Sequence, residues 1–390
     1  MQQTLEGSQA IAKTVALCRP HVVAAYPITP QTHIVENISK LVAEGQLDCE
    51  LVSVESEFSA ASVVLGASAS GARAYTASSS QGILLMSEVL YNIAGLRLPL
   101  VLTCANRAVS APLSIWNDHQ DSMAVRDAGW IQLFCADNQE AVDTTIQAFY
   151  ITEKTELPVM VCVDGFNLTH TLESIDVPEQ ELVDQYLPAL QFSRALNASR
   201  PISMGTLVSP DYFTEARHSH HIALENSKHI IVEADERWQE LTGRTCGGLL
   251  TVQGPEDARV GIISLGSTLG TLADAMEEYP ESGPAKLISL RAFRPFPHLA
   301  LAQACQGLSD VVVLERALSA GGGGIVANEL RAALYGMSDS PRIHSYAAGL
   351  GGRDIPMDIY PRIMNAIKKE VPERFAIFDV ELDKLDPADR

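Results

Sequence analysis

Basic residues are scarce in this sequence of 390 residues. It has 28 Lys and Arg against 48 Asp and Glu, which gives a formal net charge of −20. No basic stripe is present that could neutralise the phosphates of a nucleic acid, so we expect no nucleic-acid partner. An acidic chain that takes an anionic substrate also needs a cationic anchor where that substrate binds.

Long apolar runs are absent as well. No run approaches the length of a membrane span, and the start of the chain, Met1 to Glu6, lacks the basic residues and the apolar core of a signal peptide. We therefore expect a cytoplasmic protein that makes no contact with a membrane.

Cysteines are few and scattered. The seven never form a Cys-x-x-Cys pair, so we expect no disulfide, zinc site or iron–sulfur cluster within the chain, and no bound metal. Cys104, Cys135 and Cys162 lie in apolar, strand-like runs, where we expect them to be buried as small hydrophobic residues.

Apolar residues make up 46% of the sequence, enough for the cores of two or three domains. Over residues 1–170, short apolar runs alternate with segments of helical periodicity at the spacing of βαβ units. Strands that are apolar throughout are typical of a parallel sheet covered on both faces. The sequence therefore predicts an α/β domain with a doubly wound parallel sheet. Its expected strands are 21–25, 51–54, 72–77, 98–104, 130–135 and 158–163, and its expected helices are 6–18, 34–42, 59–71, 83–93 and 139–154.

The pattern weakens over residues 171–257, where prolines interrupt acidic and irregular segments, so we expect a connector there. Residues 258–370 return to alternation and predict a second, smaller α/β domain with strands near 260–266, 286–290, 310–314 and 343–347. A C-terminal tail is expected over 371–390. The glycine run Gly321–Gly324 lacks the lysine of a phosphate-binding loop and is expected to be a flexible turn.

Polar residues of the first domain follow the predicted strands at their carboxyl ends. Thr29, Glu57, the turn at 78–82, Arg107 and Asp164 all stand in such positions. Open α/β sheets place their ligands outside the carboxyl ends of the strands. These residues therefore predict one shared crevice.

Plainer interpretations stay open from the residues alone. Glu55 and Glu57 also suit the positive end of the helix expected over 59–71. Arg107 also suits an ordinary ion pair at a strand end. That helix is nearly all Ala, Ser, Gly and Val, which makes it thin enough for another surface to pack closely against it.

Six motifs follow one another along the chain: Tyr26-Pro-Ile-Thr-Pro30, Glu55-Ser-Glu57, Thr76-Ala-Ser with Gln81-Gly, Asn106-Arg107-Ala, Leu113-Ser-Ile-Trp-Asn-Asp-His-Gln-Asp121 and Asp164-Gly-Phe. Together they resemble the 2-oxoacid:ferredoxin oxidoreductase family, and within it the α subunit of the pyruvate:ferredoxin oxidoreductases. The resemblance covers most of the chain. It implies a pyrimidine-type thiamine diphosphate-binding domain, followed by a smaller domain similar to the C-terminal domain of transketolase.

The resemblance implies a CoA-dependent oxidative decarboxylation of a 2-oxoacid to CO₂ and an acyl-CoA, with two electrons passed to ferredoxin. Pyruvate, giving acetyl-CoA, is the first expectation. Branched-chain and aromatic 2-oxoacids stay open, because the Ser78–Ser80 run is one residue longer than expected and Trp116 adds a ring to its loop. A non-catalytic assembly subunit is the alternative of another class, disfavoured because Thr29, Glu57 and Arg107 are all present.

The resemblance also implies residue roles. Glu57 matches the carboxylate that hydrogen-bonds N1′ of the cofactor's aminopyrimidine, while Arg107 and Thr29 match residues that contact the substrate. These three are the expected catalytic residues. The further expected positions are Pro27, Ile28, Ser80 and Gln81 for the cofactor, Asn106 for the substrate, and Trp116, Asp118 and His119 at the pocket rim or as scaffolding of their loop.

One motif of thiamine enzymes is missing. No Gly-Asp-Gly, which usually binds Mg²⁺ and diphosphate, occurs in the sequence. The resemblance then implies that thiamine diphosphate is shared with a partner subunit, and that Mg²⁺ and [4Fe-4S] clusters lie on partner subunits. The expected partners are β, γ and δ type subunits of one complex, ferredoxin, the 2-oxoacid and CoA.

Overall fold

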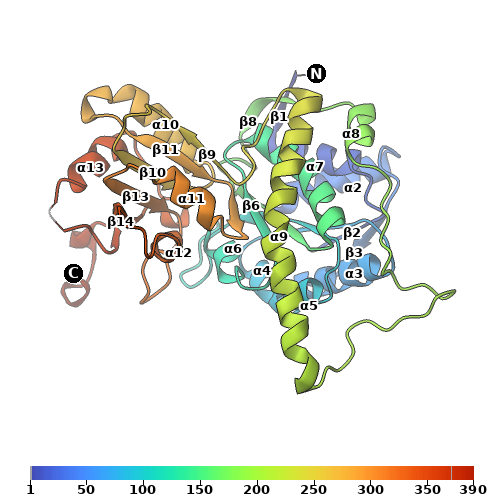
Figure 1. Cartoon of the computed structure of the whole chain (residues 1–390). Coiled ribbons are helices and arrows are strands. Elements are labelled where there is room, and N and C mark those ends of the chain that lie inside the picture. The colour runs from blue at the N-terminus through green and yellow to red at the C-terminus, as the bar shows by residue number, and fades with distance from the viewer. Residues whose placement is uncertain (1, 370) are drawn as a thin grey trace.

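The computed structural model describes residues 2–369 and 371–390. A seven-stranded sheet and a six-stranded sheet lie side by side, the first built mainly from the N-terminal half of the chain and the second from the C-terminal half (Figure 1). Both sheets are mostly parallel, and the predicted α/β fold is confirmed.

The first sheet has the strand order β12-β6-β7-β5-β4-β2-β3. Its parallel strands are β2 (Val22–Ala25), β3 (Glu50–Ser53), β4 (Ala74–Ser78), β5 (Val101–Asn106), β6 (Ile131–Phe134) and β7 (Val159–Asp164). Strand β12 (Ala292–Arg294) joins β6 in antiparallel orientation although it comes from the C-terminal half. The sequence did not predict this strand, because three residues are too few to show a pattern.

Helices cover both faces of this sheet. Helices α1 (Gly7–Leu17), α2 (Thr32–Ala43) and α7 (Asn138–Thr155) share one core, and α3 (Glu57–Ala69), α4 (Ser80–Leu85) and α5 (Ser87–Gly95) contribute to a core on the other face. The single helix expected over 83–93 is divided at Met86 into α4 and α5. Small side chains such as Ala60 and Ala61 let α3 lie close to the sheet.

The second sheet has the order β15-β14-β13-β10-β11-β9. Its strands are β9 (Leu250–Gln253), β10 (Val260–Ser264), β11 (Lys286–Leu290), β13 (Asp310–Glu315), β14 (Arg342–Ala347) and β15 (Ala376–Ile377), and its helices are α10 (Thr268–Glu278), α11 (His298–Ala304), α12 (Ile325–Ala333) and α13 (Ile359–Ala366). Strand β15 lies within the segment expected to be a tail. The boundary expected at residue 370 lies outside the described residues, and the division of the chain at 170 and 257 stays a prediction.

The segment expected to be an irregular connector contains the longest helix of the described chain. Strand β8 (Leu172–Asp176) pairs with β1 (Gln2–Glu6), α8 (Gln180–Tyr186) follows, and α9 (Pro210–Thr242) runs for 33 residues across the first domain (Figure 1). Only its second half buries a sustained apolar face, with Ile231, Ala234 and Trp238. Most residues of its first half are exposed, and its apolar residues there form no buried stripe, so the sequence showed no helical periodicity there.

Cys104, Cys135 and Cys162 are buried, as predicted, and burial raises the pKa of each thiol well above its usual value. Among the helices of residues 2–369 and 371–390, none combines the length and the apolar character needed to cross a membrane.

The glycine run is a closed turn at the start of α12. The Ser319 amide donates to the Gly323 carbonyl at 2.8 Å, and Gly321 and Gly323 have φ angles of +76° and +84°, which favour glycine. The amides of Ile325 and Val326 donate to the Glu315 carboxylate at 2.9 and 3.0 Å. The donors at this helix start are therefore used within the chain.

Candidate functional site

The parallel order of the strands places the carboxyl ends of β2, β3, β4, β5 and β7 at one edge of the first sheet. Thr29, Glu57, Arg107 and Asp164 follow or end these strands, as predicted, and so lie along the same edge. Their side chains divide into an open part around Glu57 and Arg107 and a closed part around Asp164.

Glu57 is the first residue of α3, and Ser56 caps the helix by accepting from the Ser59 amide at 3.2 Å. The Glu57 side chain is 7% exposed, yet it forms no hydrogen bond or ion pair with any described residue. A Cβ placed on Gly82 would lie 2.7 Å from Glu57 Oε1, so glycine is needed for α4 to pass this carboxylate. The Glu57 carboxylate is not among the fully enclosed polar atoms that lack a partner, so its oxygens remain open to a ligand from outside this chain.

On β4 and at the start of α4, further polar atoms are buried without a partner among the described residues: Thr76 Oγ1, Ser78 Oγ and Gln81 Nε2. Of these, Ser78 Oγ borders the same position at Gly82 as Glu57 Oε1. Ser80 differs from them. Its φ is +49°, its amide donates to Asp121 Oδ2 at 2.8 Å, and its hydroxyl is already bonded to the Ala108 carbonyl. Ser80 therefore shapes the turn after β4.

Arg107 presents an unpaired cation. Its Nε donates to the Ser114 carbonyl at 2.9 Å and its Nη1 to the Thr29 carbonyl at 2.9 Å. Within the described chain it forms no ion pair, so the structure does not bear out the plainer ion-pair interpretation. Burial lowers the pKa of the guanidinium somewhat, and the charge of Asp121 opposes that shift. The guanidinium is thus fixed in place by two carbonyls and has no direct ion pair with a described carboxylate.

The loop before α2 lies beside Arg107. The Ile28 amide donates to Gln31 Oε1 at 3.2 Å, and Gln31 Nε2 donates to the Ala77 carbonyl at 2.7 Å, which ties the loop to β4. Pro27 and Thr29 are exposed and Ile28 is half-buried. The Thr29 hydroxyl is therefore open to solvent while the Thr29 carbonyl orients Arg107.

Asp121 links the turn after β4 to the end of β5. This role was not predicted from the sequence. The fully buried carboxylate of Asp121 accepts from the amides of Ser80 (2.8 Å), Arg107 (3.0 Å) and Ser122 (2.7 Å) and from Asn106 Nδ2 (2.8 Å). Burial raises the pKa of Asp121 to about 6, and the four hydrogen bonds oppose that rise. The Asn106 amide nitrogen points towards Asp121 and Ser122, at the start of α6 (Gln120–Ala124).

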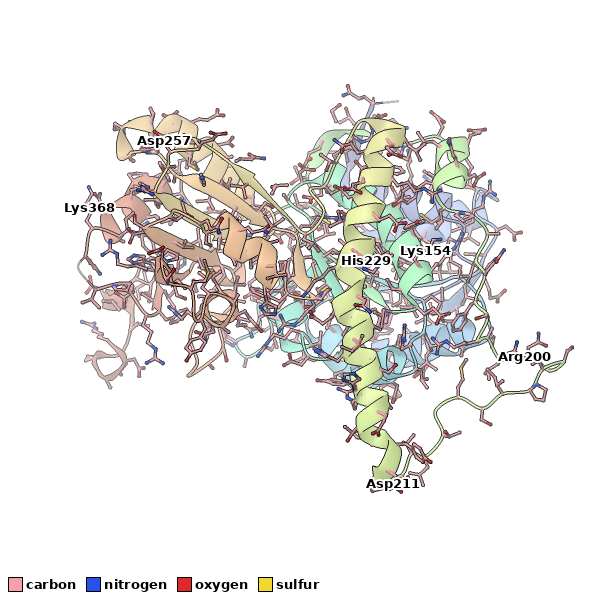
Figure 2. All side chains as sticks on the ribbon, viewed as in Figure 1. Lys154, Arg200, Asp211, His229, Asp257 and Lys368 are labelled. Atoms are coloured by element: carbon pink, nitrogen blue, oxygen red, sulfur yellow. The ribbon has the colours of Figure 1, made fainter. Side chains whose placement is uncertain are left out.

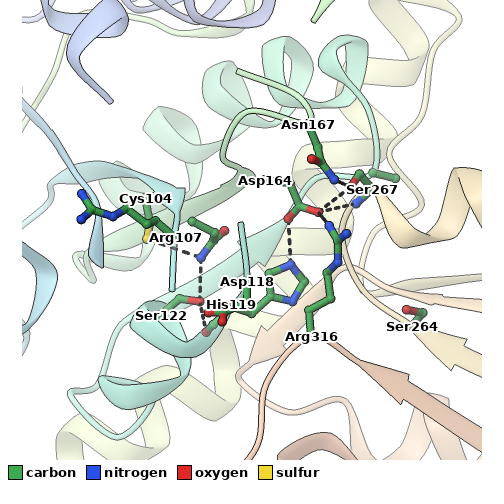
Figure 3. A network of polar contacts seen from close by, with 12 residues as sticks. Cys104, Arg107, Asp118, His119, Ser122, Asp164, Asn167, Ser264, Ser267 and Arg316 are labelled. Carbon is green, nitrogen blue, oxygen red and sulfur yellow. Dashed lines mark hydrogen bonds and ion pairs between the residues drawn. The ribbon is translucent and has the colours of Figure 1, made fainter. Parts of the chain in front are cut away.

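The closed part joins the two domains. Asp164 contacts His119 Nε2 at 2.7 Å, Ser267 Oγ at 2.6 Å and Arg316 Nη1 at 3.4 Å (Figure 3). Asp118 Oδ2 accepts from the Gly351 amide at 3.1 Å. Asp118 and His119, expected at the rim or as scaffolding, are thus engaged with the second domain.

The second domain also supports the loop that holds Arg107. The Trp116 carbonyl accepts a hydrogen bond from the Ala108 amide at 3.0 Å. The indole ring of Trp116 is half-exposed, and its centroid lies 4.6 Å from that of the Phe166 ring. A Cβ on Gly352 would collide with the Trp116 side chain, so this glycine permits the close contact. Trp116 therefore lies where the loop meets both domains.

One cluster of metal-ligating residue types lies outside this site. Glu6, His33 and His170 have ligand atoms within 4.8 Å of one another. Glu6 Oε1 and His33 Nδ1 are 2.7 Å apart and the two imidazole rings stack at 4.5 Å, so contacts within the chain account for the cluster. That this chain holds no metal stays a prediction.

Comparison with known proteins identifies two family models along the chain. Residues 13–236 match the thiamine diphosphate-binding model of pyruvate flavodoxin/ferredoxin oxidoreductases, and residues 258–359 match core domain II of pyruvate:ferredoxin oxidoreductase. The chain is 44% identical to the pyruvate synthase subunit PorA of Methanosarcina barkeri, over 94% of this chain and 92% of that one. This chain belongs to the pyruvate:ferredoxin oxidoreductase family.

Other relatives agree with this assignment. Pyruvate synthase subunit PorA of Thermotoga maritima is 42% identical over 90% of both chains, and ketoisovalerate oxidoreductase subunit VorA of Pyrococcus abyssi is 37% identical over 95% of this chain and 94% of that one. The resemblance stated from the motifs is thereby confirmed, as is the assignment to an oxidoreductase that works as part of a complex.

Solved structures support the fold. A 2-oxoglutarate:ferredoxin oxidoreductase from Magnetococcus marinus superposes with a TM-score of 0.72 at 22% identity, covering 94% of this chain and 65% of that one. A split-gene transketolase, in an inactive β4 tetramer, superposes with a TM-score of 0.54 at 13% identity, covering 93% and 96%. The expected similarity to transketolase is confirmed at the level of fold.

The residues around Glu57 fit the aminopyrimidine end of thiamine diphosphate. The unpaired carboxylate, the partnerless Ser78 hydroxyl and the Gln81 amide offer hydrogen-bonding groups of both kinds, and Gly82 keeps the approach to Glu57 open. These hydrogen-bonding groups are thus left for a ligand, and they lie within residues 13–236, which match the thiamine diphosphate-binding model.

Asp121 is predicted to hold the turn after β4 and the end of β5 together. In Asp121→Asn, one acceptor oxygen becomes a donor that faces other donors, so stability should fall by about 1–3 kcal/mol for each buried N–H left unpaired. Hydrogen exchange measured by mass spectrometry should become faster at Ser80 and Arg107. Asp257→Asn, at an exposed carboxylate of the second domain (Figure 2), is the matched control and should change neither. Unchanged exchange in the Asp121 variant would contradict this role.

Asp164 is predicted to make the domain contact sensitive to acid. Burial alone would raise its pKa, but His119, Arg316 and Ser267 outweigh burial and hold the pKa below its usual value of 3.8. The ionised carboxylate therefore stabilises the folded chain above about pH 3.8, and this contribution is lost as the pH falls below that value.

The test compares Asp164→Asn with the wild type across pH. The variant should be less stable by about 3–5 kcal/mol at neutral pH, the usual cost of breaking a buried pair. The difference in the free energy of unfolding should shrink below about pH 4, because the unfolded wild-type chain then takes up a proton at Asp164, whereas the folded chain, in which the pKa of Asp164 is lower, does not. A difference that stays constant down to about pH 3 would show that Asp164 does not carry the contact.

Proposed function

We propose that this chain is the α-type subunit of a cytoplasmic, CoA-dependent 2-oxoacid:ferredoxin oxidoreductase that decarboxylates pyruvate to acetyl-CoA and CO₂. The observation that carries the proposal is the buried Glu57 carboxylate, which finds no partner among the described residues. Pyruvate synthase subunits that are 37–44% identical to this chain favour pyruvate as the substrate.

Glu57 acts as the acceptor for the aminopyrimidine of the cofactor. A carboxylate that accepts from a ring nitrogen holds a proton there and so shifts basicity within the ring, which is the role of a general acid–base group. Bound thiamine diphosphate supplies the nucleophilic carbon and the electron sink that decarboxylation of a 2-oxoacid requires. Ser78, Gln81 and the backbone at Pro27 and Ile28 complete the pocket of this chain.

Arg107 binds the carboxylate of the 2-oxoacid. Its guanidinium is oriented by the carbonyls of Thr29 and Ser114, which leaves its charge for an anion. The exposed Thr29 hydroxyl donates to the same substrate. Asn106 acts through Asp121 and orients the strand end on which Arg107 stands. Trp116 lies at the edge of this pocket, whereas Asp118 and His119 fix the same loop to the second domain.

The remaining parts of the reaction belong to partners. β, γ and δ type subunits supply the diphosphate site with Mg²⁺ and the [4Fe-4S] clusters, and ferredoxin accepts the electrons. The missing Gly-Asp-Gly motif and the absence of any Cys-x-x-Cys pair support this division.

A branched-chain 2-oxoacid is the second candidate substrate. It is favoured by the ketoisovalerate oxidoreductase relative, which is 37% identical over most of both chains. A panel of 2-oxoacids assayed with the assembled complex, CoA and a low-potential acceptor decides between the two. A non-catalytic role predicts no turnover with any of them.

Glu57→Gln tests the acid–base role. The amide keeps the size of the side chain but loses its negative charge, so turnover should fall by about 10²–10⁴-fold. Exchange of the C2 proton of the bound cofactor, followed by NMR, should slow as well, with cofactor occupancy retained. Glu55→Gln, two residues away and exposed, is the matched control and should behave as wild type. Wild-type rates of C2 proton exchange in Glu57→Gln would contradict the acid–base role of Glu57.

Arg107→Ala tests substrate recognition separately from the cofactor. The substrate carboxylate would be left desolvated without a counter-charge, at a cost of about 2–5 kcal/mol, so kcat/KM should drop by roughly 30-fold to several thousand-fold. Thr29→Ala should cost less, about 1–3 kcal/mol. Arg107→Lys restores the charge without the fork and should fall between Arg107→Ala and wild type. Loss of thiamine diphosphate from Arg107→Ala with unchanged affinity for the 2-oxoacid would contradict the role.

A further inference from the structure

The segment between α8 and α9, residues 187–209, is here called the arm. It passes α3, projects away from the body of the first domain and returns to the start of α9 (Figure 1). Arg200 near its tip and Asp211 just after it both lie well beyond the sheets (Figure 2). Nothing in the proposed chemistry of Glu57 and Arg107 uses this segment.

The base of the arm is anchored on the first domain. Phe192 and Met204 pack against the core that contains α3 and α5. Arg194 binds Glu156 Oε2 at 2.8 Å, and the Leu196 amide donates to the Ala69 carbonyl, the last residue of α3, at 2.8 Å. These contacts fix the direction in which the arm leaves the domain.

The outer part of the arm and the first turn of α9 expose large apolar side chains. Leu207 is fully exposed and Tyr212 is 69% exposed. Single exposed apolar residues are ordinary, but several close together in the sequence mark an interaction surface. They are Leu196, Ile202, Leu207, Val208, Tyr212 and Phe213.

Acidic residues avoid this region. None of the 48 Asp and Glu residues falls within 58–87, which covers α4 and all of α3 after Glu57, or within 185–210, which covers the arm. The charged residues of these two stretches are Arg73, Arg194 and Arg200. In a chain of net charge −20, such depletion is typical of the core of a protein interface.

Helix α3 continues the same surface. Its sequence is apolar or small on every side, and such a helix is normally buried all round. In this chain its outer face is open, with Phe58 exposed on α3 and Leu85 and Tyr91 exposed on the neighbouring α4 and α5. The helix has Glu57 at its start and meets the arm at its end, about 20 Å away.

We propose that the arm and the outer face of α3–α5 form one docking surface, and that its occupant is the partner subunit that completes the thiamine diphosphate site. The inference rests on the proposed function, because that function requires a partner at Glu57. A subunit that covers Glu57 and continues along α3 reaches the arm, which then holds it at the end remote from the chemistry. The arm is thus an assembly device, separate from the residues that bind substrate.

The test uses the complete complex, formed by co-expression of this chain with its partner subunits. Leu207→Asp and Phe213→Asp alter exposed arm-side residues, and the milder Leu207→Ser serves as a second variant. Tyr335→Asp and Leu299→Asp, equally apolar and exposed on the second domain, are the matched controls. The arm variants should weaken association with the partner by about tenfold or more in a sedimentation or interferometry titration, whereas the controls should bind as wild type.

Each outcome is decisive for the arm. Arm variants that bind the partner with wild-type affinity would overturn the proposal. So would variants that keep the partner but lose the pairing of two complexes, because a second copy of this chain would then be the occupant. A wild-type complex that depends on the arm but oxidises no 2-oxoacid would leave the docking surface standing and refute the proposed function instead.

Discussion

The carboxylate of Asp121 accepts hydrogen bonds from Ser80, Asn106, Arg107 and Ser122, and the open part of the site depends on it. These donors belong to three segments, namely the turn after β4, the end of β5 and the start of α6. A buried acceptor shared by four donors fixes them more firmly than separate contacts with water would. The position of Arg107 follows from this, because its backbone is held by Asp121 while its side chain is held by Thr29 and Ser114.

With that frame fixed, two opposite charges are kept without partners inside the same chain. Glu57 and Arg107 are both mostly buried, and neither forms an ion pair within the described residues. Other charged residues, which stabilise the contact between the domains, are paired: Asp164 binds His119 and Arg316. The fold thus distinguishes charges that join the domains from charges that remain available for ligands, as expected of a functional site.

Much of this was predictable from the sequence. The strands of the first sheet are short apolar runs, and the polar residues at their carboxyl ends could be placed on one edge by topology alone. The role of Asp121 was not predicted, because its carboxylate binds mainly backbone amides, and such contacts leave no pattern in the sequence. The roles of Arg316 and Gly352 were not predicted for a related reason. Their partners, Asp164 and Trp116, lie in the other domain. Helix α9 was missed because its first half faces solvent and lacks an apolar stripe.

The central claim is that this chain supplies one half of a thiamine diphosphate site and leaves the other half to a partner. Calorimetric titration of the isolated chain with thiamine diphosphate and Mg²⁺ tests it most directly. In the proposed site, the residues around Glu57 would contact only the aminopyrimidine, which would not offset the cost of ordering the whole cofactor. The account therefore predicts no detectable binding by the isolated chain and tight binding once the partner subunits are present. Micromolar binding by the isolated chain would contradict it.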